Sequence, residues 1–220
     1  MNRKGKKVKD RIKKYNEIFD EYKNQYDKTK ISFRTIQGEV PVLISAPHSV
    51  RQLRNGKIKG KDLYTGPIVM EIANQTQCYA IYKIFNNQDD ANYDIENNEY
   101  KEKVLEIIKQ RDIQLFIDIH GASDNDEFDI DIGTDDYKNL NEKKEVLEKF
   151  IQLCNKNGIY KIGIDKKFKA NTLHTITKTV AINTKIPCMQ IELTRKYRSI
   201  EDFEKMRKII DIIVELIKDF

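Results

Sequence analysis

The sequence predicts an α/β fold with a single-domain, mixed and largely parallel sheet that carries helices on both faces, preceded by a basic N-terminal helix. Three observations support this prediction. Apolar runs of strand type alternate with segments whose apolar residues recur every three or four positions. The length of 220 residues and the hydrophobic share of 39% are enough for one core. No repeat, low-complexity tract or linker interrupts residues 31–220, so we treat them as one domain.

Residues 1–30 hold the basic excess of the chain. They contain 11 Lys and Arg against 5 Asp and Glu, whereas the other residues carry 29 basic and 30 acidic side chains. Apolar residues recur at helical spacing over 7–26, which predicts a helix with one narrow apolar stripe. We expect this stripe to pack across the domain or against a partner subunit, so the oligomeric state stays open. Nucleic-acid binding is the less favoured interpretation, because a nucleic-acid binder more often carries its positive charge on the globular face that does the binding, with aromatic residues among it.

The first half of the domain begins with two expected strands, 31–36 and 40–46, the second an almost continuous apolar run. Residues 49–61 then form a polar and basic connection that is long for an ordinary loop and typical of a functional one. Asp62 stands where the N-cap or first-turn acid of a helix over 63–72 is expected.

The rest of the chain alternates the same two patterns. The expected strands are 79–85, 115–119, 129–133, 160–164 and 187–193, and the expected helices are 99–110, 141–157, 172–184 and 200–219. Ser199, with Asp202 three residues later, predicts a capping-box variant at the start of the last helix.

Cysteine use and hydropathy limit the class of protein. Cys78, Cys154 and Cys188 show no C-x-x-C spacing, which indicates reduced cytoplasmic thiols rather than disulfides or a thiolate zinc site. No apolar run is long enough for a bilayer, and residues 1–20 lack the apolar core of a signal peptide. We therefore expect a cytoplasmic protein with no membrane partner.

Two of the three histidines, His48 and His120, each follow an apolar run of strand type, and Asp62 and Glu192 occupy comparable positions. In an open α/β sheet such positions converge on one edge. Two imidazoles and one carboxylate suit Zn²⁺ with a fourth position left to water, although nickel, cobalt or iron accept the same ligands. Glu192, inside an apolar strand, is the candidate to take the proton from that water.

Each of these residues also has a structural interpretation. A histidine after a strand is often a hydrogen-bonded loop residue, and Asp62 fits an ordinary helix N-cap. Glu71 is a second candidate ligand, with a surface charge as the alternative. Asp118 points to the same side of its strand as His120 and is placed to orient that ligand from behind.

Four further residues are candidates for substrate contacts. Arginines near a metal site often hold a substrate carboxylate, and the third histidine lies in a Thr-rich segment. The candidates are Arg51, Arg195, Arg198 and His174. Surface charge or helix capping is the alternative for each of them.

Six short motifs occur in an order that resembles the N-formylglutamate amidohydrolase family over residues 35–200. They are Pro47-His48-Ser49, Lys61-Asp62-Leu63, Asp90-Ala91-Asn92, Asp118-Ile119-His120, Asp131-Ile132-Gly133 and Glu192-Leu193-Thr194-Arg195. The resemblance implies a zinc-carboxypeptidase-like fold and metal-assisted hydrolysis of an amide with a small acyl group. It also implies a metal held by His48, Asp62 and His120, Glu192 as general base or acid, and a substrate pocket shaped by Asn92 and Arg195.

The chain also departs from the family. Zinc carboxypeptidases place an acidic ligand three residues after the first histidine, and here that position is Arg51, so the acid must come from farther along. Val50 and Tyr93 stand where the family usually has Gly and Arg. These departures argue against N-formylglutamate itself. They favour a divergent branch with another small-molecule amide as substrate, or a member that binds ligands without catalysis. The candidate arginines Arg51, Arg195 and Arg198 would anchor an acidic group of that substrate.

Overall fold

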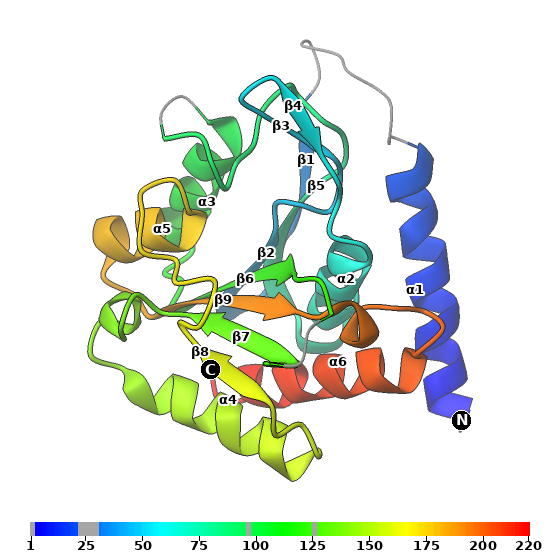
Figure 1. The fold of residues 1–220 in the computed structure, drawn as a ribbon. Coiled ribbons are helices and arrows are strands. Elements are labelled where there is room, and N and C mark those ends of the chain that lie inside the picture. Colours follow the sequence, from blue (N-terminus) through cyan, green and yellow to red (C-terminus); the bar gives the residue numbers. More distant parts are fainter. Residues whose placement is uncertain (1–2, 22–30, 96–97, 125–126) are drawn as a thin grey trace.

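The computed structural model describes residues 3–21, 31–95, 98–124 and 127–220 (Figure 1). Within these ranges the strands of the main sheet are β1 (Phe33–Ile36), β2 (Val40–Ala46), β5 (Cys78–Lys83), β6 (Leu115–Gly121), β7 (Ile130–Gly133), β8 (Ile162–Ile164) and β9 (Cys188–Leu193). Their order across the sheet is β1-β5-β2-β6-β9-β7-β8. The central strands β5, β2, β6 and β9 are parallel, whereas β1 and β7 run antiparallel to their inner neighbours.

Helices cover both faces of this sheet (Figure 1). They are α1 (Arg3–Glu21), α2 (Thr65–Thr76), α3 (Glu99–Gln110), α4 (Lys144–Lys156), α5 (Ile176–Thr184) and α6 (Phe203–Ile217). The larger apolar core lies between the sheet and α1, α2, α4 and α6, and a smaller one lies under α3 and α5. The predicted fold class, a mixed and largely parallel sheet with helices on both faces, is confirmed.

The basic helix α1 packs across the domain through its apolar stripe. Val8, Ile12 and Phe19 are buried in the larger core. Beside them, the guanidinium of Arg11 donates a 2.8 Å hydrogen bond from Nε to Glu71 of α2, whose side chain is 0% exposed. The interpretation of Glu71 as a surface charge is therefore wrong. The expected helix extended to residue 26, and positions 22–26 lie outside the described residues.

The connection after β2 contains a hairpin that we did not predict. Its strands are β3 (Gln52–Arg54) and β4 (Lys57–Lys59), paired antiparallel. Asn55 and Gly56 form the turn with φ values of 50° and 71°. Two positive φ angles are what a type I′ turn requires, and Asn-Gly is its preferred sequence. This dipeptide was the available signal, but the strands around it are short and basic.

Two expected helix caps are absent. The helix α2 begins at Thr65 after Tyr64, and Asp62 contributes only its backbone carbonyl, which accepts hydrogen bonds from the N–H and hydroxyl of Thr65. The N-cap interpretation of Asp62 is thus wrong, and its carboxylate is left for other contacts. The capping box is also wrong, because α6 begins only at Phe203 and the Ser199 hydroxyl bonds Glu201 instead.

Two composition-based expectations concern cysteines and membranes. Cys78, Cys154 and Cys188 are all buried, and none forms a disulfide. Among the described residues, every helix is too short or too polar to cross a bilayer.

Candidate metal centre

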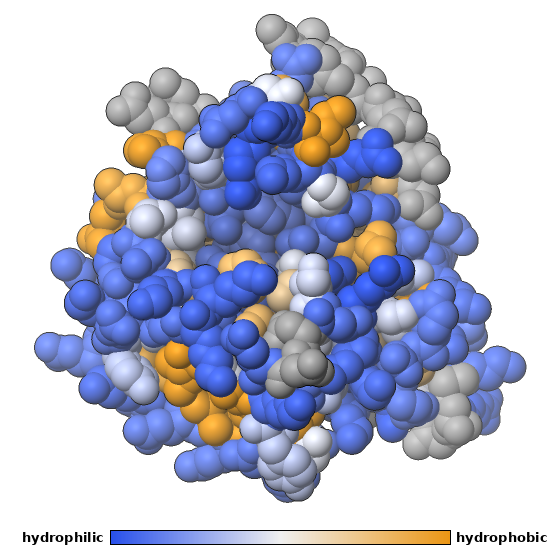
Figure 2. Space-filling model, in the orientation of Figure 1, coloured by the Kyte–Doolittle hydropathy of each residue, from blue (hydrophilic) through white to orange (hydrophobic). Residues whose placement is uncertain are grey.

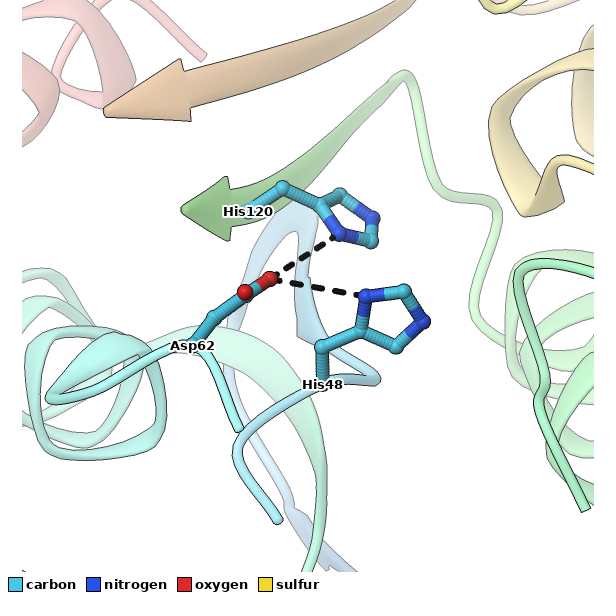
Figure 3. Close-up of side chains that lie close together, drawn as sticks. All are labelled: His48, Asp62 and His120. Atoms are coloured by element: carbon cyan, nitrogen blue, oxygen red, sulfur yellow. Dashed lines mark ion pairs between the residues drawn. The ribbon is translucent and has the colours of Figure 1, made fainter. Parts of the chain in front are cut away.

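His48, Asp62 and His120 meet at the carboxyl ends of β2 and β6, which are neighbours in the sheet (Figure 3). His48 lies in the turn after β2. His120 lies inside β6, which runs two residues farther than predicted, to Gly121. The two rings are 4.7 Å apart between centroids and nearly perpendicular. Asp62 reaches them from the segment after the β3–β4 hairpin, where its backbone N–H donates to the carbonyl of His48 over 2.8 Å.

Both imidazoles direct the same ring nitrogen at the same carboxylate oxygen. Asp62 Oδ2 lies 3.4 Å from Nδ1 of His48 and 3.5 Å from Nδ1 of His120. Ligands about 2.1 Å from a tetrahedral zinc ion are separated by about 3.4 Å, so these distances fit two edges of such a site. One ligand atom from each of the three residues lies within 4.8 Å of the other two. The donor set therefore fits zinc.

The second nitrogen of each ring faces a buried carboxylate. Nε2 of His48 lies 2.8 Å from Oδ1 of Asp90, and Nε2 of His120 lies 3.1 Å from Oδ2 of Asp118. Such partners fix the orientation of a metal-binding imidazole and increase its basicity. The placement of Asp118 is as expected. Asp90 was overlooked as a site residue, although the Asp90-Ala91-Asn92 motif contains it.

The ionisation of these groups follows from their mutual contacts. Burial opposes a charge on His120, but Asp118 and Asp62 outweigh burial and raise the pKa of His120 well above its ordinary value. The pKa of His48 is also raised, by Asp62 and Asp90 against burial. In turn, the histidines hold the pKa of Asp62 well below its usual range despite burial. The cluster thus favours negatively charged carboxylates, which a cation would stabilise further.

Glu192 of β9 stands beside His120 across the parallel strand pair. It is buried, and its carboxylate accepts a 2.9 Å hydrogen bond from Nε2 of Gln190. Burial raises the pKa of Glu192 to about 7, although His120 acts in the opposite direction. A carboxyl group with a pKa near 7 can both accept and donate a proton at neutral pH.

These groups open into a cavity of about 420 Å³, which we call the central pocket. Its walls include His48, Asp62, His120 and Glu192, together with Asn92, Tyr93 and His174 and residues of the segment 168–172. Figure 2 shows this side of the molecule as predominantly hydrophilic and recessed below the β3–β4 hairpin. Most residues that line the central pocket are polar or charged, and the candidate metal ligands are among them.

The predicted substrate-contact residues fall into two groups. Asn92 and His174 line the central pocket, with the His174 ring stacked on Tyr93 at 4.9 Å. The lining residues include none of Arg51, Arg195 and Arg198.

Arg198 does not line the central pocket because its side chain is held elsewhere. Its buried guanidinium donates hydrogen bonds to the backbone carbonyls of Leu193, Ala122 and Leu63. Arg51 and Arg195 are exposed. The pocket arginine is instead Arg54 of β3, whose Nε donates a 2.8 Å hydrogen bond to Asp90.

The comparisons with known proteins bear on the fold. No protein-family model matches the chain, and no curated protein matches it. Among solved structures, a gene product of Agrobacterium tumefaciens superposes with a TM-score of 0.64 at 10% identity, over 92% of this chain and 97% of that one. A bacteriophage poly-gamma-glutamate hydrolase superposes with a TM-score of 0.55 at 13% identity, over 86% of this chain and 87% of that one.

A third match is a metallo-carboxypeptidase from Pseudomonas aeruginosa, with a TM-score of 0.55 at 12% identity, over 94% of this chain and 68% of that one. At such low identities the likeness shows the fold alone. The carboxypeptidase-like α/β fold implied by the sequence resemblance is therefore confirmed.

Proposed function

We propose that this chain is a zinc-dependent hydrolase that cleaves the amide bond of a small N-acyl amino acid or a related compound, in the manner of the N-formylglutamate amidohydrolase family. One observation carries the proposal: two imidazoles direct Nδ1 at the same oxygen of Asp62, and Glu192 stands beside one of them in the same pocket. A structural zinc site does not need a buried carboxyl such as Glu192 beside its ligands, and neither does a solvated loop.

In this proposal His48, Asp62 and His120 hold the metal, with Asp90 and Asp118 fixing the two rings from behind. Zinc supplies Lewis acidity, which lowers the pKa of water and polarises an amide carbonyl. Glu192 accepts the proton of the attacking water and returns it to the leaving amine. Its pKa of about 7 suits both roles at neutral pH.

The lining of the central pocket supports a substrate with an acidic group. The basic side chains of this lining are Arg54, which pairs with Asp90, and Lys169, and His174 adds hydrogen-bonding capacity. A guanidinium binds carboxylates well because its donors match both oxygens. One neighbour of the same fold is named a poly-gamma-glutamate hydrolase, which supports a search among acidic amides. We therefore propose a small acidic amide as the substrate, with no nucleic acid or membrane as partner.

Metal content is the first test. Elemental analysis of the purified protein should give about one zinc per chain, and this zinc should be lost in the double variant His48→Ala/His120→Ala. Asp112→Asn, which removes an exposed charge at a residue that does not line the central pocket, is the control and should keep the metal. A wild-type protein that stays metal-free after zinc is supplied overturns the proposal.

Turnover is the second test. The zinc-loaded protein is incubated with N-formyl and N-acetyl derivatives of glutamate, aspartate and uncharged amino acids, and the released amine is measured. Hydrolysis that favours the acidic derivatives supports the proposal. Zinc binding without hydrolysis of any derivative would instead favour the alternative, a ligand-binding member of the fold that lacks catalysis.

A further inference from the structure

We infer that Asp131 of β7 is a positioning residue that fixes one wall of the central pocket by holding the backbone of the segment 166–172. Asp131 itself does not line the pocket, but five consecutive residues of this segment do: Phe168, Lys169, Ala170, Asn171 and Thr172. The effect on the substrate rests on the proposed function, whereas the effect on the segment does not.

The contacts of Asp131 are directed at one short stretch of backbone. Its carboxylate accepts hydrogen bonds from three consecutive N–H groups, those of Lys166 at 3.2 Å, Lys167 at 2.8 Å and Phe168 at 3.0 Å. Asp131 is 0% exposed. A buried carboxylate is costly unless hydrogen bonds satisfy it, so these N–H groups and Asp131 stabilise one another.

A second carboxylate makes the reciprocal contact. Asp165, just after β8, accepts hydrogen bonds from the backbone N–H groups of Thr134, Asp135 and Asp136, just after β7. The contacts are thus reciprocal between the parallel strands β7 and β8. A carboxylate of β7 binds the loop after β8, and a carboxylate just after β8 binds the loop after β7. These reciprocal hydrogen bonds fix where the segment 166–172 leaves the sheet.

Two glycines allow the segment to lie this close. A Cβ at Gly163 would come within 2.6 Å of Oδ1 of Asp131, and a Cβ at Gly133 would come within 2.3 Å of the carbonyl oxygen of Phe168. Both distances are too short for a real contact. The chain therefore keeps side chains out of the space that the carboxylate and the segment need.

The strand pairing connects this support to the proposed chemistry. Asp131 is the register partner of Glu192 in the antiparallel pair β7 and β9. Partners in such a pair project from the same face of the sheet. Asp131, which holds the pocket wall, and Glu192, the proposed general base, therefore lie side by side on neighbouring strands.

The test compares Asp131→Asn with the control Asp112→Asn in limited trypsin digestion of the zinc-loaded protein. The segment offers cleavage after Lys166, Lys167 and Lys169, which mass spectrometry identifies. Losing the charged acceptor of three hydrogen bonds should make cleavage there about tenfold faster in Asp131→Asn, with zinc content unchanged. Equal cleavage rates in the two variants would overturn the inference.

Kinetics test the consequence for the substrate. Asp131→Asn should raise KM for an acidic N-acyl amino acid while changing kcat by less than about threefold, because substrate contacts are weakened and the reacting groups are untouched. Faster cleavage by trypsin with unchanged KM would overturn the role in substrate binding. If the wild type hydrolyses nothing, the proposed function fails, and the digestion still decides whether Asp131 holds the segment.

A second variant covers the case in which Asp131→Asn does not fold. Gly163→Ala keeps Asp131 but places a methyl group against Oδ1 of its carboxylate, which accepts the hydrogen bond of the Lys166 N–H. It should give the same faster cleavage after Lys166, Lys167 and Lys169. A Gly163→Ala protein that resists trypsin as well as the wild type contradicts the inference.

Discussion

Nε2 of His48 lies 2.8 Å from Oδ1 of Asp90, while Nδ1 of the same ring faces Asp62. Asp90 is fully buried, and the histidine and Arg54 together hold its pKa well below the usual range despite burial. The carboxylate is therefore charged at neutral pH and fixes both the tautomer and the orientation of the ring. His120 has the same arrangement with Asp118.

Asp90→Asn and Asp118→Asn should each weaken zinc binding by about 10- to 100-fold, because an amide neither polarises nor orients the imidazole as a carboxylate does. Competition with a chromophoric chelator measures the affinity, and Asp112→Asn serves as the control. Wild-type affinity in both variants would show that the carboxylates do not support the ligands.

Asp62 and Glu71 were alternative acidic ligands in the sequence, and the structure separates them. Asp62→Asn should lose most of its zinc, whereas Glu71→Gln should keep it, because Glu71 is paired with Arg11 of α1. Glu71→Gln should mainly lower the urea midpoint, since it breaks an ion pair whose carboxylate is buried. Elemental analysis of both variants decides which residue is the acidic ligand. Zinc that is lost in Glu71→Gln and kept in Asp62→Asn would make Glu71 the ligand.

Glu192→Gln should reduce turnover of the best N-acyl substrate by about 10²- to 10⁴-fold, because an amide cannot accept the proton from water. Zinc content should not change, because Glu192 is absent from the ligand cluster. Glu201→Gln, at an exposed position, is the matched control. Near-wild-type kcat in the zinc-loaded Glu192→Gln protein would assign the base to another residue.

Arg54→Met should raise KM for acidic N-acyl amino acids more than for uncharged ones, because the lost guanidinium lines the central pocket. The matched control is Arg51→Met, three residues earlier, since Arg51 is exposed and not among the lining residues. Initial rates over a range of concentrations give KM for both substrate classes. A larger effect of Arg51→Met would restore the assignment made from the sequence.

Lys101 of α3 joins the two loops that carry Asn92 and His174. Its ammonium group donates hydrogen bonds to the carbonyls of Leu173 at 3.0 Å and His174 at 2.7 Å, and to that of Asp94. Burial lowers the pKa of Lys101 to about 8, from 10.5 for a free lysine. Between these values the unfolded chain binds more protons than the folded protein, so this group makes the free energy of unfolding rise with pH.

Lys101→Met removes this titration. The stability of the wild type relative to Lys101→Met should therefore increase from neutral pH to about pH 10. Urea midpoints at several pH values measure the difference, and Lys103→Met, two residues later on the same helix and paired with Glu106, is the control. A difference that stays constant across this range contradicts the lowered pKa.

The sequence located most elements because each depends on local pattern. The helix 99–110 and the strand 40–46 were predicted with the boundaries that the structure has. His48, Asp62 and His120 were also selected correctly as neighbours, because strands of a parallel sheet end at one edge. The hairpin β3–β4 was missed, since each of its strands has only three residues and a single apolar one, which is too short a run to predict a strand.

Other features depended on pairing across long distances in the chain. Asp90 lies 42 residues from His48, and Glu71 lies 60 residues from Arg11. Arg198 was expected at the substrate but is held by backbone carbonyls as far away as Leu63.

The sequence by itself determined the α/β class and the strand ends near which the candidate ligands His48 and His120 lie, because hydrophobic periodicity records which residues face the core. Only the tertiary structure decided which carboxylate faces each histidine, which arginine reaches the central pocket and how Asp131 holds the pocket wall. These contacts join side chains to backbone groups of distant segments, and no local pattern records such pairs.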